Sequence, residues 1–160
     1  MTDTNGGFPL PDPTCELTRG FWERAARRQL AIPRCDGCGA YVWYPEPVCP
    51  HCGGLSMSWV SMSGRATLFT WVVVHHGFLP SFRDKVPFVP GLVCLEEDRS
   101  IRVVTTIVDC RAEDLVAGMP VSVVFRPLTF TGVDREVLAP LFKPDDRSVA
   151  PRSAPPDAGR

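Results

Sequence analysis

The sequence lacks any hydrophobic run that could cross a membrane, and neither sign of charge dominates it. A spanning helix needs about 20 consecutive apolar residues, whereas the apolar segment Phe69–Val74 has the length of a buried strand. The 160 residues include 17 basic and 18 acidic side chains, so the formal net charge is −1. Such a protein has no overall field that would attract nucleic acid. With 44% apolar residues, we expect a globular core, and neither a membrane nor a nucleic acid as partner.

Recognisable catalytic motifs are also absent. The chain has neither a Gly-x-Ser-x-Gly nucleophile elbow nor a glycine-rich phosphate loop, and it has only three histidines. His51 lies between two cysteines and is interpreted as a solvent-facing spacer. His75 is a candidate to line a pocket, but its neighbour His76 would point to the opposite face of a strand, and a solvated strand-end histidine is the simpler interpretation. We therefore expect no enzymatic activity from the chain on its own.

The cysteines are the most informative residues that the sequence does contain. Four of the seven form two short pairs, Cys35-x-x-Cys38 and Cys49-x-x-Cys52, with ten residues between the pairs. Two thiolate pairs of this spacing can close a tetrahedron around one metal ion. A glycine follows each pair, at Gly39 and Gly53, which suits turns with positive φ whose amides point at the sulfurs. We predict a structural zinc ribbon, with no open metal position for a catalytic water.

Other interpretations of the cysteine pairs are disulfides, a redox site and an iron site. Disulfides are disfavoured because no N-terminal apolar run marks the chain for export, and a reducing cytoplasm is expected. A thioredoxin-like site needs one CxxC near a βαβ pattern, not two on a hairpin rich in glycine and proline. A rubredoxin-type iron site stays open, because four thiolates do not exclude iron. Zinc bound by four thiolates would change the net charge by −4 + 2, to about −3.

Composition and periodicity divide the chain into five segments. We predict a disordered arm, an N-terminal helix, the zinc ribbon, an OB-fold and a disordered tail, over residues 1–14, 15–32, 33–60, 61–143 and 144–160. Thr18 is the expected N-cap of the helix, which should run to about Leu30. In the ribbon, Tyr41–Tyr44 is expected to form a strand between the metal turns, with aromatics that cover a very small core.

The second half of the chain predicts a mainly β fold. Five short strands are expected over Ala66–His76, Phe88–Glu96, Ile101–Asp109, Met119–Arg126 and Val137–Phe142. A short helical stretch, Arg111–Ala117, lies between the third and fourth strands. Five strands with one helix in this position are the order of the Greek-key OB barrel.

Three arginines of the N-terminal helix form a candidate binding surface. Arg24, Arg27 and Arg28 follow i, i+3, i+4 spacing, so their guanidinium groups would crowd one stripe of the helix. Such a stripe could hold phosphates or the acidic residues of a partner protein. An ordinary solvated helix face is the competing interpretation.

A second candidate surface is the loop Gly77–Phe82. It carries Phe78, Leu79 and Phe82, three large apolar side chains that are costly to leave in water. Another chain, a ligand, or the metal module of the same chain could cover them. We expect this loop to contact a ligand or a partner.

The order of these motifs resembles a known family, the zinc-ribbon/OB-fold acyl-CoA-associated proteins of the domain of unknown function 35 type. The likeness covers roughly residues 16–144, and the joint order of the motifs is more specific than any one of them. In order, the motifs are Phe21-Trp22, Arg34-Cys35-x-x-Cys38-Gly39, Cys49-Pro50-x-Cys52-Gly53, Pro87-Phe88-Val89-Pro90, Ala112-Glu113-Asp114-Leu115, Gly118-Met119-Pro120-Val121 and Pro140-Leu141-Phe142-Lys143-Pro144.

The resemblance implies a non-catalytic accessory subunit. Members of the family accompany thiolase-superfamily enzymes, so the expected assembly is a hetero-oligomer with a thiolase or a lipid-transfer-protein-like aldolase that acts on acyl-CoA. The likeness is closest to the branch that removes steroid side chains. Carried onto this sequence, the four paired cysteines match the metal ligands of the family, whereas the family offers no equally sharp motif for a ligand.

The alternative function is binding of nucleic acid, because zinc ribbons and OB barrels both serve that role elsewhere. The two functions can be distinguished by the residues of the second and third barrel strands, which would line the binding groove of a nucleic-acid-binding OB-fold. There Leu92–Cys94 and Val103–Thr106 supply no stacking aromatic side chain, and Arg102 is nearly the only cation. This composition argues against the alternative.

Overall fold

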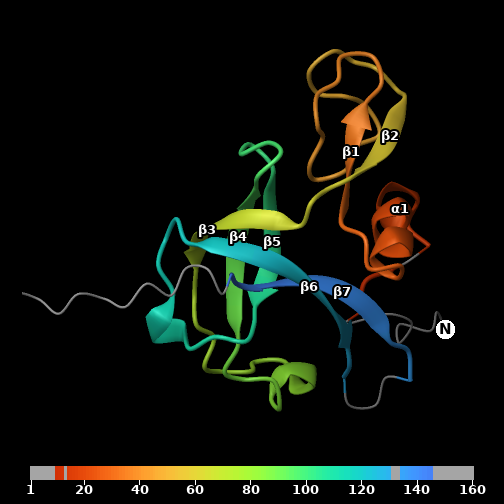
Figure 1. The fold of residues 1–160 in the computed structure, drawn as a ribbon. Coiled ribbons are helices and arrows are strands. Elements are labelled where there is room, and N and C mark those ends of the chain that lie inside the picture. Colours follow the sequence, from red (N-terminus) through yellow and green to blue (C-terminus); the bar gives the residue numbers. More distant parts are fainter. Residues whose placement is uncertain (1–9, 13, 131–133, 146–160) are drawn as a thin grey trace, which may run out of the picture.

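The computed structural model describes residues 10–12, 14–130 and 134–145, which form a small two-stranded lobe, one helix and a β-barrel. Figure 1 shows the lobe and helix α1 on one side of the barrel. Most of the arm predicted over residues 1–14 and of the tail predicted over 144–160 lies outside the described residues. Of the described part, Leu10 is buried, and the Pro11 carbonyl accepts a hydrogen bond of 2.9 Å from Arg135 Nη2. No helix within the described ranges has the length and apolarity needed to span a membrane.

Helix α1, Glu16–Ala25, is shorter than predicted and begins earlier. Cys15, not Thr18, is the N-cap, and its carbonyl accepts hydrogen bonds from the amides of Thr18 and Arg19. A tight turn ends the helix, with Arg28 in a left-handed conformation (φ 59°). The prediction that the helix reaches Leu30 is wrong, because Leu30 is buried and the chain enters strand β1 at the next residue. Burial of non-local contacts outweighs helix propensity here.

The zinc ribbon is built on strands β1, Ala31–Cys35, and β2, Met57–Ser61, which pair antiparallel. The predicted strand over Tyr41–Tyr44 is wrong, since that segment makes a single bridge, Arg34↔Tyr41. Within this segment the Trp43 ring packs on helix α1, 5.3 Å from the ring of Phe21, whereas the Tyr41 ring lies 5.8 Å from the guanidinium of Arg34.

Five strands close into a barrel in the order β3-β4-β5-β7-β6, so the predicted OB-fold is confirmed. Their bounds are Arg65–Trp71 (β3), Val89–Leu95 (β4), Arg102–Ile107 (β5), Pro120–Leu128 (β6) and Val137–Pro144 (β7). The helix predicted between the third and fourth strands is reduced to a 3-10 turn, Ala112–Asp114, and another such turn occupies Pro80–Phe82.

One hydrophobic core joins the three parts of the molecule. Phe21 of α1 and Ile32 of β1 belong to the same buried cluster as Leu68 and Phe142 of the barrel. A separate, smaller cluster surrounds Val42 next to two of the paired cysteines. The shared core therefore fixes the ribbon and the helix against the barrel.

Candidate metal centre and neighbouring surfaces

The two cysteine pairs lie on two turns of the same construction. The amide of Gly39 donates to the Cys35 carbonyl at 2.8 Å, and the amide of Gly53 donates to the Cys49 carbonyl at 2.9 Å. Both glycines have φ of 75°, in the left-handed region. The sequence predicted positive φ at these two positions, and the prediction is confirmed.

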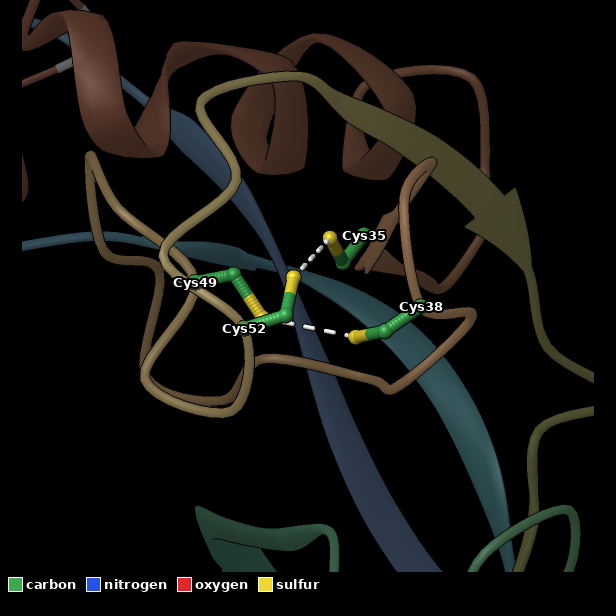
Figure 2. Close-up of side chains that lie close together, drawn as sticks. All are labelled: Cys35, Cys38, Cys49 and Cys52. Carbon is green, nitrogen blue, oxygen red and sulfur yellow. Dashed lines mark hydrogen bonds between the residues drawn. The ribbon is translucent and has the colours of Figure 1, made fainter.

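The four sulfur atoms converge on one point, as Figure 2 shows. All lie within 4.8 Å of one another, and the Sγ–Sγ distances are 3.6 Å for both Cys35–Cys52 and Cys38–Cys49. A tetrahedral ion with zinc–sulfur bonds of about 2.3 Å requires sulfur–sulfur distances of about 3.8 Å. The donor set therefore fits structural zinc, with no ligand position left over for water or substrate.

The pKa values of two of these thiols also indicate that a bound cation is needed before all four can ionise. The amides of Cys38 and Gly37 hydrogen-bond the Cys35 sulfur and, against burial, lower the pKa of Cys35 to about 7. At Cys52 the Gly54 amide favours the thiolate, but hydrogen bonds with the neighbouring thiols outweigh it and raise the pKa of Cys52 to about 12. Four crowded thiols cannot all ionise alone, because like charges repel. Zn²⁺ would supply the compensating charge, and its ligation requires the thiolates.

Only one of the three arginines expected on the helix belongs to it, since α1 ends at Ala25. Arg24 is on α1, where its Nη1 donates to the Gly20 carbonyl at 3.1 Å and its guanidinium lies 5.6 Å from the centre of the Trp59 ring. Arg27 and Arg28 follow the helix in the exposed turn. Because the helix ends at Ala25, helical i, i+3, i+4 spacing does not apply to Arg27 and Arg28, and a binding role for the three arginines stays a prediction.

The predicted loop surface is exposed in part. Phe78 is 91% exposed and Leu79 is 49% exposed, whereas the Phe82 ring packs 6.1 Å from Phe88 and 5.2 Å from Phe130. His75 is exposed and lies beyond the end of β3. Within the described part of the chain, the metal module does not cover Phe78. Of the three alternatives considered for this loop, a ligand and another chain remain.

A groove that sequence reasoning missed lies between α1, the ribbon and the barrel. Its cavity volume is about 230 Å³, and its walls come from α1, the segment Trp43–Pro45, and strands β5, β6 and β7. Two of its lining residues, Thr105 and Pro140, are joined by a hydrogen bond of 3.1 Å from the Thr105 hydroxyl to the Pro140 carbonyl. The periodicity of Phe21 and Trp22 indicated only a buried helix face, because the groove exists only after distant segments are brought together.

The outer face of the barrel also carries an aromatic side chain beside a cation. The Arg102 guanidinium of β5 lies 4.3 Å from the centre of the Phe69 ring of β3. The sequence of the second and third barrel strands showed Arg102 without an aromatic neighbour, since Phe69 comes from the first strand. Val72 and Val104 are also exposed apolar side chains, at 60% and 77%.

Family models and relatives place the chain among known proteins. The model of the ChsH2 rubredoxin-like zinc ribbon domain matches residues 22–58, and that of the ChsH2 C-terminal OB-fold domain matches residues 59–126. A DUF35 domain-containing scaffold protein of Methanocaldococcus jannaschii is 32% identical over 115 residues, which cover 71% of this chain and 79% of that protein. A probable enoyl-CoA hydratase alpha subunit of Thermomonospora curvata is 34% identical over 135 residues. These are 84% of this chain, which spans only 40% of the length of that relative.

A solved structure extends the likeness to three dimensions. The Ltp2-ChsH2(DUF35) aldolase contains a chain that superposes with a TM-score of 0.71 at 30% sequence identity. The match covers 84% of this chain and 98% of that one. Agreement in the ribbon and the barrel, and the match to 79% of the length of a DUF35 scaffold relative, show that this chain belongs to the DUF35 family.

Proposed function

We propose that this chain is a non-catalytic scaffold subunit that binds a thiolase-superfamily enzyme, either a thiolase or a thiolase-like aldolase. The observation that carries the proposal is the likeness to the DUF35 chain of the Ltp2-ChsH2(DUF35) aldolase, over 98% of that chain. Two relatives named as DUF35 domain-containing scaffold proteins support the same role.

The geometry of the site agrees with a scaffold. A zinc ion held by four thiolates stabilises a fold but has no open position for catalysis. Large apolar side chains stay in water on the described surface, with Phe78 91% and Val104 77% exposed. Such side chains are costly to hydrate, and a partner protein that covers them would gain binding free energy.

The finer proposal concerns the substrate of the complex. We propose an acyl-CoA substrate for the partner enzyme, with cleavage of a steroid side chain as the specific setting. The acyl-CoA class is supported by the relative named as an enoyl-CoA hydratase subunit, and an aldolase reaction by the name of the solved complex.

Co-purification tests the proposed function. The chain carrying an affinity tag is expressed in its native host and isolated under mild conditions, and the proteins that accompany it are identified by mass spectrometry. We expect a thiolase-superfamily subunit in a fixed ratio to the chain. Recovery of the chain without such a subunit, or turnover of acyl-CoA by the chain alone, would contradict the proposal. A salt-dependent gel shift with single-stranded DNA or RNA would instead favour the nucleic-acid alternative.

The exposed loop is proposed as one contact with the partner. We expect the triple change Phe78→Ala, Leu79→Ala and Phe82→Ala to weaken assembly about tenfold, because it removes apolar area that the partner would bury. Isothermal titration with the co-purified partner measures the dissociation constant. The barrel should stay folded, although Phe82 packs on Phe88, so the double change Phe78→Ala and Leu79→Ala serves as the cleaner variant. Unchanged affinity of both variants would eliminate the loop as an interface.

A further inference from the structure

We propose that the metal site controls the shape of the groove between α1, the ribbon and the barrel. The segment Trp43–Pro45 forms one wall of this groove and lies between the two cysteine pairs in sequence. When the four cysteines hold Zn²⁺, this wall segment is fixed against helix α1, and loss of the ion releases it. This coupling operates in the isolated chain, whatever occupies the groove, and so goes beyond the proposed function.

The adjacent residues Val42 and Trp43 pack in two different hydrophobic clusters. Val42 is 3% exposed and belongs to the small cluster that contains the metal ligands Cys35 and Cys49. Trp43 packs instead against the core shared by α1 and the barrel, with its ring 5.3 Å from that of Phe21. A single peptide unit thus connects the metal cluster to the groove, and a displacement of Val42 must also displace Trp43.

The segment between the cysteine pairs depends on the metal site for its position. Its contacts with strand β1 are one β-bridge, Arg34↔Tyr41, and a hydrogen bond of 2.9 Å from the Val42 amide to the Pro33 carbonyl. Two of the three buried side chains in the small cluster are metal ligands themselves. A cluster of this size buries too little apolar area to be stable without the ion. Loss of the ion should therefore loosen Val42 while the barrel, with its own larger core, stays folded.

Aromatic contacts attach the wall segment to the helix. The Tyr44 ring lies 5.3 Å from that of Trp43, and the Trp22 ring lies 4.9 Å from that of Phe21. These distances are within the range of about 4.5–7 Å in which aromatic pairs attract each other. All four rings line the groove, so Trp43 is the link between the wall segment and α1. Displacement of Trp43 breaks this link and widens the groove.

Thermodynamic linkage gives this coupling a measurable consequence for zinc binding. If zinc favours the packed wall, then changes that disrupt the packing must weaken zinc binding by the same factor. Phe21 is on α1 and is not a metal ligand, so it can affect zinc affinity only through the packing of the ribbon. Phe125 of β6 is the matched control, because its ring also packs on the shared core but belongs to the barrel.

Zinc affinities of full-length variants test the linkage, measured by competition with a chromogenic chelator. We expect Trp43→Ala and Phe21→Ala each to raise the Kd for zinc at least about fivefold, which is the lower end of typical coupling between sites. Phe125→Ala should change the Kd less than about twofold. If Phe21→Ala does not fold, Trp43→Ala decides the test alone. An unchanged Kd for Trp43→Ala, or an equal rise for Phe125→Ala, would overturn the coupling.

Fluorine NMR of the wild-type chain tests the coupling from the other side. The four tryptophans are labelled as 5-fluorotryptophan, and their signals are assigned by single replacements with phenylalanine. When a chelator removes the zinc, the Trp43 signal should shift, whereas that of Trp71, an equally half-buried residue of β3, should stay in place. Elemental analysis confirms the removal. A Trp43 signal that does not move shows that the wall is held without zinc, and a Trp71 signal that moves as much shows that zinc supports the whole fold. Either result overturns the coupling.

These outcomes are independent of the proposed function, because neither measurement uses a partner. Failure of both tests leaves the scaffold role standing, and failure to co-purify a thiolase-superfamily subunit leaves the coupling standing. The expected results together would show that zinc occupancy determines whether the groove is formed.

Discussion

Cys49→Ser is expected to release the metal and unfold the ribbon. Cys49 is 1% exposed and its Sγ lies 3.6 Å from that of Cys38, so the serine replaces one of four converging ligands with a poor one. In small zinc-binding domains the metal contributes roughly 10–16 kcal/mol of apparent binding free energy, most of which stabilises the fold. The β1–β2 pair has only five register positions, and the small core cluster of the metal turns includes Cys35 and Cys49 themselves, so loss of the metal should loosen that cluster.

Elemental analysis and hydrogen exchange measure this effect. The wild type should hold about one zinc per chain and protect the amides of β1 and β2, whereas Cys49→Ser should lose both the zinc and the protection. Cys94→Ser is the matched control, because Cys94 is also buried but lies in barrel strand β4, away from the metal ligands. A Cys49→Ser protein that retains zinc, a protected ribbon and partner binding would refute the structural role of the metal.

Phe142→Ala is expected to cause the largest loss of stability in the barrel. The Phe142 side chain is fully buried. Among the residues described, Phe142 also forms the only register pair between β5 and β7, with Ile107. Truncation of a buried phenylalanine typically costs about 3–5 kcal/mol, through lost transfer free energy and the cavity that remains. Because a domain of this kind is stable by only about 5–15 kcal/mol, this is a large share of the total.

Urea denaturation of the zinc-loaded protein gives the free energy of unfolding for this comparison. Phe78→Ala provides the same chemical change at a side chain that is 91% exposed, and it should shift stability by less than about 0.5 kcal/mol. If Phe142→Ala costs less than about 1 kcal/mol, the barrel core is not closed around this ring as described.

The zinc ligands, the glycine turns and the order of barrel strands could all be predicted because their signals are local. Two cysteines two residues apart specify a metal turn whatever surrounds them, and Gly39 and Gly53 have the positive φ that such turns require. Alternating apolar residues likewise specified the strands of the OB-fold, because side chains on a strand change face at every residue. The site of the metal thus follows from the chain itself.

Tertiary contacts decided the features that local patterns got wrong or did not contain. Helix α1 stops at Ala25 because Leu30 and Ile32 gain more by burial in the shared core than by extending the helix, and this leaves Arg27 and Arg28 outside the helix that carries Arg24. The groove arises where α1, β5 and β7 meet, although these segments are far apart in sequence. Sequence alone therefore determined which residues bind zinc, and only the packing of distant elements determined which surface is left for a partner.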